Sequence, residues 1–534
     1  MLNSQTPNRL LLLFAAMLLP LLSIAQGLDQ KIDEAFAPIS DRVSSIVFFT
    51  IGDTPFVLIL LVGSALIFTL IFGFPNLRYF ATAINVVRGK YDEVDDHAGT
   101  DTMYGDSTPG GDVFETIKDE SQEGEVTHFQ ALATAVSGTV GNGNIAGVAL
   151  AIALGGPGAT FWMIICGFLG MSTKFVECTL GVKYRDVGPD GTVYGGPMYY
   201  ISKGLKEKGF GMLGKIAAVF FAIFCIGGSF GGGNAAQSNQ ATIVIKELFG
   251  WDSTSAGALV GLVMAVVVGI IIIGGIKRIA SVTEKVVPFM AVLYIIACLY
   301  IILSNFSLVD NAIALVIREA FNPTAIGVGS VIGVLLVGFQ RAAFSNEAGA
   351  GSASIAHSAV KTKYPASEGL VALLEPFIDT VVICTMTALV IIIYNYGGHF
   401  EYGGDGTGSV IIGGESFEGA GITSKAFANY IPFSNVFLTI AVVLFAVSTM
   451  ISWSYYGLQS WKYLFGRSKA ADLTYKLLFC TFIVIGAAAS MNSIWAFSDA
   501  MIFAMVFPNM VGLYLLFPVV KKELKKYMTA IKKA

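Results

Sequence analysis

Charged residues are scarce in this chain: they make up 13% of its 534 residues, whereas 54% are hydrophobic. A soluble globular domain has about 25% charged residues, so the composition excludes that class. Apolar runs of about 20 residues, the length of a membrane-crossing helix, recur from one end to the other. A membrane β-barrel would show strictly alternating segments of about ten residues, which the unbroken apolar run at 259–275 excludes. The sequence therefore predicts an all-α polytopic membrane protein.

Basic stripes, paired cysteines and histidine clusters are also missing. Because no basic stripe interleaved with aromatics is present, nothing indicates a nucleic-acid partner. All six cysteines fall inside apolar runs and are unpaired in sequence, which is typical of small buried hydrophobic residues. His357 and His399 stand alone, and no Ser/His/Asp or metal-ligand grouping is found. We therefore expect neither an enzyme nor a resident cofactor.

The N-terminus predicts a signal peptide over 1–25. Arg9 precedes a short apolar run, and the small residues Ser23 and Ala25 provide a cleavage pattern. An uncleaved first helix is the alternative. In both cases the following segment, 26–53, is expected outside the cytoplasm.

Eleven membrane spans are expected after this leader: one extra helix and then a ten-helix core. The parts of the chain are an extra helix at 54–75, an acidic cytoplasmic linker at 76–127, a core at 128–520 (first repeat 128–305, second repeat 326–520) and a basic cytoplasmic tail at 521–534. The core spans are expected at 128–155, 158–183, 212–243, 256–275, 285–304, 326–356, 368–394, 434–462, 473–490 and 493–519. The segment 308–320 is expected to lie amphipathically on the outer surface.

Basic residues give the orientation. When the spans alternate from an outer start, few basic residues fall outside, whereas Lys277, Arg278, Lys361, Lys363 and the tail fall inside. This asymmetry matches the positive-inside rule. It predicts an extracytoplasmic N-terminus and a cytoplasmic C-terminus.

The run SGTVGNGNIAG at 137–147 stands in the middle of the first core span. A backbone group that leaves the helix in hydrocarbon costs several kcal/mol unless protein or a water-filled cavity satisfies it. A phosphate-binding loop is excluded because no Gly-Lys-Ser/Thr follows. TVGNG differs by one letter from the TVGYG filter of potassium channels, but it lies within a continuous span and not between a pore helix and a pore-lining helix. We therefore predict a broken helix.

A second interruption, SNEAGAGS at 345–352, lies in the sixth core span. Broken helices five spans apart are what an inverted five-plus-five repeat gives, and such pairs indicate the binding site of a secondary transporter. The freed amides and the positive end of a half-helix attract a carboxylate, whereas freed carbonyls suit a small hard cation. One such region can hold an amino acid beside sodium.

Several side chains elsewhere in the core allow two interpretations. Gln237, within a helix interior, is expected to face a cavity or a polar partner. Ser448 and Thr449 either hydrogen-bond their own helix backbone or offer oxygens to an ion. Trp453, mid-span and away from an interface, either walls a small pocket or only packs.

Intramembrane carboxylates are functional candidates by default. Glu347 flanks the second interruption, and Glu375 and Asp379 lie four residues apart on one helical face. The last two could also lie near a wet helix end. Lys174 and Glu177 are expected near the cytoplasmic interface.

At these residues the chain resembles the alanine/glycine:cation symporter family, the sodium:alanine symporters. The resemblance extends over 50–512 and rests on five motifs: GTVGNGNIAGVALAIALGGPGATFW, GMSTKFVECTLGVKYR, YGGPMYYI, FSNEAGAGSASIAH and LEPFIDTVVICTMTAL. It implies a leucine-transporter-type 5+5 inverted repeat preceded by one extra helix. It also implies sodium-driven uptake of alanine, glycine or a similar small neutral amino acid, across a bacterial inner membrane.

The resemblance also implies the site residues. The substrate would be bound by Thr139, Gly141, Gly143, Asn144, Gln237, Asn346 and Trp453. Sodium, as the coupling ion, would be bound by Gly138, Ser448 and Thr449. The sequence does not fix the oligomeric state, and a monomer is expected. Two rival functions stay open: a proton-coupled symporter of the same fold in which Glu347 or Asp379 titrates, and an ion channel.

Overall fold

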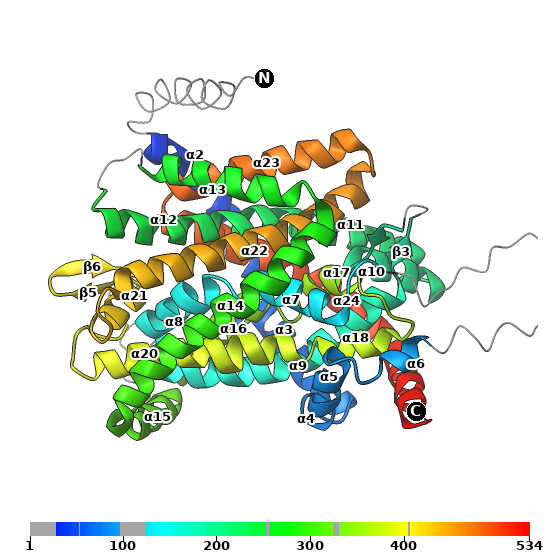
Figure 1. Ribbon diagram of the computed structural model, residues 1–534, viewed down its shortest axis with the longest axis horizontal. Helices are drawn as coiled ribbons and strands as arrows, with labels where there is room; N and C mark the ends of the chain where they lie inside the picture. The colour runs from blue at the N-terminus through cyan, green and yellow to red at the C-terminus, as the bar shows by residue number, and fades with distance from the viewer. Residues whose placement is uncertain are drawn as a thin grey trace, which may run out of the picture.

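The computed structural model describes residues 28–52, 54–96, 124–188, 191–251, 256–323, 330–403 and 406–533. About 79% of the structure is helical, and its long helices run side by side along one direction (Figure 1). The expected signal peptide lies outside the described residues, as does most of the expected acidic linker. The described residues also form three two-stranded hairpins: β1 (Thr50–Ile51) with β2 (Thr54–Pro55), β3 (Asp186–Val187) with β4 (Val193–Tyr194), and β5 (Val410–Ile412) with β6 (Glu415–Phe417).

Helices occupy the spans that the sequence predicts, and further helices lie in the segments expected as the extracytoplasmic N-terminal segment and the cytoplasmic linker. The N-terminal ones are α2 (Leu28–Val47), α3 (Phe56–Ile71), α4 (Pro75–Arg78), α5 (Phe80–Val87) and α6 (Asp92–Asp96). The first half of the core contains α7 (His128–Thr139), η3 (Gly143–Gly147), α8 (Val148–Gly155), α9 (Gly158–Lys183), α10 (Pro197–Glu207), α11 (Gly211–Phe230), η4 (Gly231–Ala235), α12 (Ala236–Phe249), α13 (Ala256–Ile272), α14 (Gly275–Ser304) and the peripheral α15 (Phe306–Phe321). The second half contains α16 (Val331–Asn346), α17 (Ala353–His357), α18 (Pro365–Val371), α19 (Leu374–Pro376), η5 (Phe377–Cys384), α20 (Thr385–Asn395), α21 (Ala420–Ala428), α22 (Ser434–Phe465), α23 (Lys469–Ala488) and α24 (Met491–Lys533).

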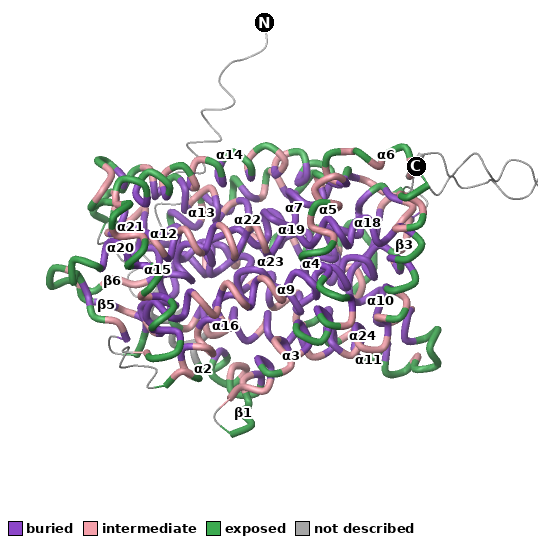
Figure 2. Tube along the Cα trace, turned by 90° about the horizontal axis from the view of Figure 1, so that it is seen from below, coloured by how far each residue is buried: buried purple, intermediate pink, exposed green. Residues whose placement is uncertain are grey.

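The polytopic helical class is confirmed. Among the described residues, seven helices are long and apolar enough to cross a membrane, or eight when the bent pair of α7 with η3–α8 counts as one. The shorter apolar helices α3, α13 and α16 stand where three more spans are expected, and the total of eleven stays a prediction. Buried residues gather in the interior of the bundle, as Figure 2 shows. On its outside, α13 and α14 expose large apolar side chains, among them Val263, Ile270 and Phe289, as a surface facing lipid does.

Both predicted interruptions are present. The first core span bends by 50° between α7 and η3, and the sixth breaks between Asn346 and Ala353. The short helix α10, after the second core span, and α21, after the seventh, lie at opposite ends of the molecule (Figure 1). Corresponding elements at opposite ends are what an inverted repeat produces.

The two broken helices share a backbone seam where the segment before α7 meets the segment after α17. The Glu125 N–H donates to the carbonyl of Ala359 (2.7 Å), and the Lys361 N–H donates to the carbonyl of Val126 (2.8 Å). Val126 and Val360 form a parallel β-bridge. The segment that enters α7 is therefore tied by main-chain bonds to the segment that leaves α17.

Some bounds differ from those expected. The last helix does not end near 519 but continues to Lys533, so the expected basic tail extends α24 and carries its lysines along a helix. Likewise α14 begins at Gly275 and not at 285. The expected extracytoplasmic segment contains α2, which packs along α24 with the Ser40 hydroxyl donating to the carbonyl of Ser493 (3.0 Å).

Candidate functional site

The first break leaves amides that side chains satisfy. Val140 makes the last bond of α7, its N–H donating to the carbonyl of Val136 (2.7 Å). The Gly141 N–H then donates to Asn144 Oδ1 (2.9 Å), and the Asn142 N–H donates to Gln237 Oε1 (3.0 Å). Backbone groups that leave the helix at this depth thus find partners within the protein, as they must in hydrocarbon.

The second break lies directly against the first. Glu347 follows α16 in the left-handed region (φ 55°), and the Ala348 N–H donates to Asn346 Oδ1 (3.0 Å). A Cβ atom added to Gly143 would lie 3.5 Å from the Cα of Ser345. The close contact between the breaks, expected from the sequence, is therefore present.

An enclosed cavity of about 10 Å³ lies between the breaks. This volume is about that of one water-sized probe. Its lining residues come from both broken helices and from η4, α12, α22 and α24: Gly138, Thr139, Gly143, Gly232, Gln237, Phe344, Ser345, Glu347, Thr449, Trp453 and Ile502. Six of the ten predicted site residues are among them: Gly138, Thr139, Gly143, Gln237, Thr449 and Trp453.

Trp453 forms one wall of this cavity and is held in place on two sides. Its Nε1–H donates to Glu347 Oε1 (2.9 Å), and the Ser352 hydroxyl donates to the other oxygen of that carboxylate. Behind the ring, a Cβ atom on Gly233 would lie only 2.1 Å from Trp453 Cγ. The indole is buried, with 1% of its surface exposed, and has no room to shift towards η4.

Four predicted residues are not among the lining residues. Asn144 turns away, its Nδ2 donating to Asp379 Oδ1 (2.6 Å), and Asn346 Nδ2 donates to Thr380 Oγ1 (2.9 Å). The Ser448 hydroxyl donates to a carbonyl of its own helix, that of Phe445 (3.0 Å). The fourth, at position 141, lies behind the lining: a Cβ there would be 2.4 Å from Thr449 Oγ1.

Oxygen atoms of α7 and α22 face each other beside the cavity. The Thr449 hydroxyl donates to the carbonyl of Ser137 (3.0 Å), and the Ser137 hydroxyl donates to the carbonyl of Ser448 (2.8 Å). Hydroxyl and carbonyl oxygens are the ligands that hard cations prefer. The predicted pairing of the first and eighth core helices at this point is present, with Ser137 as a further oxygen donor that the sequence interpretation missed.

Asp379 collects hydrogen bonds from both breaks. Its carboxylate accepts from Asn144 Nδ2 (2.6 Å), from the Ser345 hydroxyl (2.9 Å to Oδ2) and from the Thr380 hydroxyl (2.6 Å). It is fully buried, and within the described part of the chain no Lys, Arg or His forms an ion pair with it. A buried carboxylate with neutral donors only is suited to bind a cation or a proton.

A second buried cluster corrects the prediction that His357 stands alone. Glu368 on α18 bridges two histidines: one oxygen contacts His128 Nδ1 at the start of α7, and the other lies 2.5 Å from His357 Nδ1 at the end of α17. His357 Nε2 also lies 3.6 Å from Glu375 Oε2, whose other oxygen accepts from Lys174 Nζ (2.9 Å).

This cluster also bears on the expected surroundings of Lys174, Glu177 and Glu375. All three side chains are fully buried between helices, so Glu375 does not lie at a wet helix end. Glu177 Oε1 accepts from Asn509 Nδ2 on α24 (2.7 Å). The cysteines follow the prediction: all six are free and five are buried.

Known proteins match the chain over most of its length. The family model "Sodium:alanine symporter family" matches residues 111–534. A sodium/alanine symporter of Methanococcus maripaludis is 38% identical over 89% of this chain and 94% of its own length. A putative sodium/proton-dependent alanine carrier protein of Bacillus subtilis is 38% identical over 78% of this chain and 84% of its own length. The crystal structure of MhsT in complex with L-phenylalanine is 14% identical and covers 74% of this chain and 99% of that one with a TM-score of 0.49.

A bundle of apolar helices in which two broken helices enclose a polar cavity defines a multi-pass membrane transporter. Both the family model and the relatives agree with this class. The chain belongs to the sodium:alanine symporter family.

Proposed function

We propose that the protein is a sodium-coupled symporter that carries alanine, glycine or a similar small neutral amino acid into the cytoplasm by alternating access. The observation that carries this proposal is the enclosed polar cavity between the two breaks, lined by Gln237, Trp453 and Thr449. The relative from Methanococcus maripaludis, named a sodium/alanine symporter, supports the same substrates.

The substrate would lie in the central cavity with its carboxylate at the first break. Asn142 and Gly141 present amides there, and Gln237 Oε1 now occupies one of them. A substrate carboxylate that accepted from the Asn142 N–H would release Gln237 Oε1, which could then accept from the substrate. Thr139 and Gly143 would complete the platform. Two other predicted residues, Asn144 and Asn346, would hold the breaks in position without lining the cavity, because each hydrogen-bonds η5.

Sodium would bind where α7 meets α22. The Thr449 hydroxyl and the carbonyl of Ser137 are neighbours there; Gly138 follows Ser137 in the sequence, and Ser448 precedes Thr449. Asp379 beside Ser345 offers a second oxygen-rich position. Moving one positive charge inward gains about 2.3 kcal/mol per 100 mV of membrane potential.

The small cavity and its tryptophan wall favour a small substrate. Trp453 is fixed between Glu347 and Gly233, so a leucine side chain would clash with it. A channel would need a continuous aqueous path, whereas every residue that lines this cavity is buried. We propose a monomer in the cell inner membrane, with the N-terminus outside and the C-terminus in the cytoplasm. Sodium is the only cofactor in this proposal.

Uptake by proteoliposomes tests the proposal. Radiolabelled alanine should accumulate when sodium is higher outside and the pH is equal on both sides. It should not accumulate under an inward proton gradient without sodium. Accumulation under neither gradient would refute the proposal.

A proton-coupled symporter is the second candidate, since Asp379 is a buried carboxylate that has no ion-pair partner among the described residues and one relative is named sodium/proton-dependent. It predicts uptake under the proton gradient alone. Asp379→Asn, which keeps the side chain's shape but cannot exchange a proton, should then abolish proton-driven uptake and leave alanine exchange in the absence of a gradient.

A further inference from the structure

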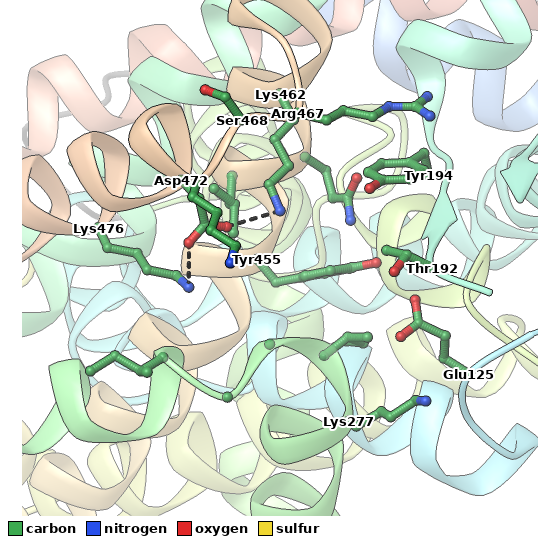
Figure 3. Close-up of a pocket in the computed structure, with 17 residues that line it drawn as sticks. Glu125, Thr192, Tyr194, Lys277, Tyr455, Lys462, Arg467, Ser468, Asp472 and Lys476 are labelled. Carbon is green, nitrogen blue, oxygen red and sulfur yellow. Dashed lines mark ion pairs between the residues drawn. The ribbon is translucent and has the colours of Figure 1, made fainter. Parts of the chain in front are cut away.

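We propose that a cavity at the cytoplasmic end of the bundle is a binding site for a phosphate-bearing anion. The cavity has a volume of about 490 Å³ and lies between the start of α14, the end of α22, the turn into α23 and strand β4 (Figure 3). Small-molecule sites have volumes of roughly 300–1,000 Å³. It shares no lining residue with the central cavity, so the site goes beyond the proposed transport function. Only its assignment to the cytoplasm rests on the orientation proposed above.

Positive charge dominates the lining. Five basic side chains line the cavity but only two carboxylates, Glu125 and Asp472. Asp472 is shared by two of the cations, with Lys462 Nζ 2.9 Å from Oδ1 and Lys476 Nζ 2.6 Å from Oδ2, as the dashed lines in Figure 3 show. One carboxylate therefore lies between two ammonium groups, and this trio keeps a net charge of about +1.

The other three cations leave further charge uncompensated. Arg467 contacts Asp186 (3.3 Å) and stacks on Tyr194, with the guanidinium carbon 3.7 Å from the ring centroid. Lys277 and Lys469 form no ion pair within the described part of the chain. Clusters of cations on low-dielectric walls concentrate anions.

The start of α23 adds to this field. Ser468 caps that helix, its hydroxyl accepting from the Ala471 N–H (3.2 Å), and both Ser468 and Lys469 line the cavity. The N-terminal end of a helix carries partial positive charge and binds anions.

Within the described part of the chain, two buried polar groups of the lining have no hydrogen-bond partner other than each other's side chains, which points independently to a ligand. They are the Tyr455 hydroxyl and Gln459 Oε1, on side chains of residues that are 4% and 2% exposed. Figure 3 shows Tyr455 reaching across the cavity towards Thr192. Buried polar groups are nearly always hydrogen-bonded. A ligand that accepts from the tyrosine and donates to the glutamine would satisfy both.

These features fit a phosphate that bears a hydroxylated group. Phosphate oxygens accept from lysine, arginine and tyrosine, and they favour the bidentate geometry of a guanidinium such as Arg467. A ribose or glycerol hydroxyl could donate to Gln459 Oε1. Glu125, which accepts from the Val193 N–H (2.8 Å), gives such hydroxyls a second acceptor. A nucleoside diphosphate and the headgroup of phosphatidylglycerol share this chemistry.

Titration of the purified full-length protein tests the site. In a neutral detergent, calorimetry would follow ADP, inorganic pyrophosphate and a short-chain phosphatidylglycerol in turn. Replacing both unpaired lysines, Lys277→Gln with Lys469→Gln, should weaken binding by roughly tenfold. The matched control replaces Lys206 and Lys208, which are exposed at the same end on and just beyond α10, and should leave the affinity unchanged. Tyr455→Phe, which removes one hydroxyl only, should weaken binding by about threefold or more.

The three probes separate the sources of the ligand. If the unaltered protein binds ADP or pyrophosphate and the pocket variant does not, the ligand is soluble. If the unaltered protein binds only phosphatidylglycerol, and the pocket variant does not, the ligand is a lipid headgroup. Absence of saturable binding for all three probes, or equal affinity in the pocket and control variants, would overturn the proposal. Alanine uptake by the pocket variant shows that it is folded, so loss of anion binding is distinguishable from failure of the transport proposal.

Discussion

Replacing Glu368 by glutamine should loosen the cytoplasmic half of the first broken helix. Each carboxylate oxygen of Glu368 bonds one imidazole, that of His128 on α7 or that of His357 on α17. Glutamine has one acceptor oxygen, and its NH₂ group can only donate. The NH₂ group can bond only a histidine whose Nδ1 carries no proton, so at least one bond to a charged carboxylate is lost in the Glu368→Gln protein, although the shape of the side chain is kept.

The magnitude follows from the kind of bond that is lost. A hydrogen bond to a charged group contributes about 1.5–3 kcal/mol. Because about 1.4 kcal/mol corresponds to a tenfold change in an equilibrium, separation of α7 from α18 should become about 10- to 150-fold more frequent. This is a shift between existing conformations and not a loss of the fold.

A cysteine at Thr134 would report the separation. Thr134 lies on α7, is fully buried and hydrogen-bonds Thr283 on α14 through the two hydroxyls (3.1 Å), so movement of α7 away from its neighbours exposes it. An impermeant maleimide added to the cytoplasmic face of inverted vesicles should label Thr134→Cys at least about tenfold faster when Glu368→Gln is also present. Vesicles without the added cysteine give the background from the native thiols.

Glu523→Gln is the matched control. Glu523 pairs with Lys183 (2.9 Å) and is also buried, but it lies on α24. It should lower stability without raising the labelling rate. If Glu368→Gln lowered the melting temperature and left labelling unchanged, the carboxylate would have no part in holding α7, and the reasoning would be refuted.

Three further changes follow from the buried pair and the cavity wall. Lys174→Met leaves Glu375 buried without the lysine cation and should lower the free energy of unfolding by about 3–5 kcal/mol. The double change Lys174→Met/Glu375→Leu should recover most of that loss. Unfolding in mixed micelles measures both variants. Gly233→Ala places a methyl group against Trp453 and should raise the KM for alanine by roughly tenfold, because overpacking costs about 1–3 kcal/mol. The control Gly63→Ala, which has open space at its Cβ, should leave uptake kinetics unchanged. Trp453→Leu removes the wall, so leucine should begin to compete with alanine; competition that stays absent would contradict the assignment of the wall.

The breaks could be predicted from sequence because few other arrangements tolerate such runs within a membrane. Glycines and small polar residues at 141–144 and 345–352 expose backbone groups that only a protein-lined cavity satisfies. Gln237, Thr449 and Trp453 also line the cavity, and their roles in binding stay predictions. Each is a polar or bulky residue in the middle of an apolar helix, which is a local signal.

The directions of the remaining side chains depend on contacts distant in sequence. Asn144 and Asn346 turn towards Asp379 and Thr380, and nothing local to either asparagine signals that helix. The expected common face of Glu375 and Asp379 is interrupted because a π-helical turn, η5, begins at Phe377.

The histidine–carboxylate cluster shows the same limit. His128 lies 240 residues before Glu368, so spacing could not reveal that they pair. Phe344 and Ile502 line the cavity as ordinary apolar residues, which no sequence pattern singles out.

The seam between Glu125–Val126 and Ala359–Lys361 limits how this transporter can open. These main-chain bonds couple the segment that enters α7 to the segment that leaves α17, so we expect the two half-helices to move together. A displacement of one half-helix, caused by an ion bound beside α7 or by the cluster at the end of α17, is therefore transmitted to the other half-helix.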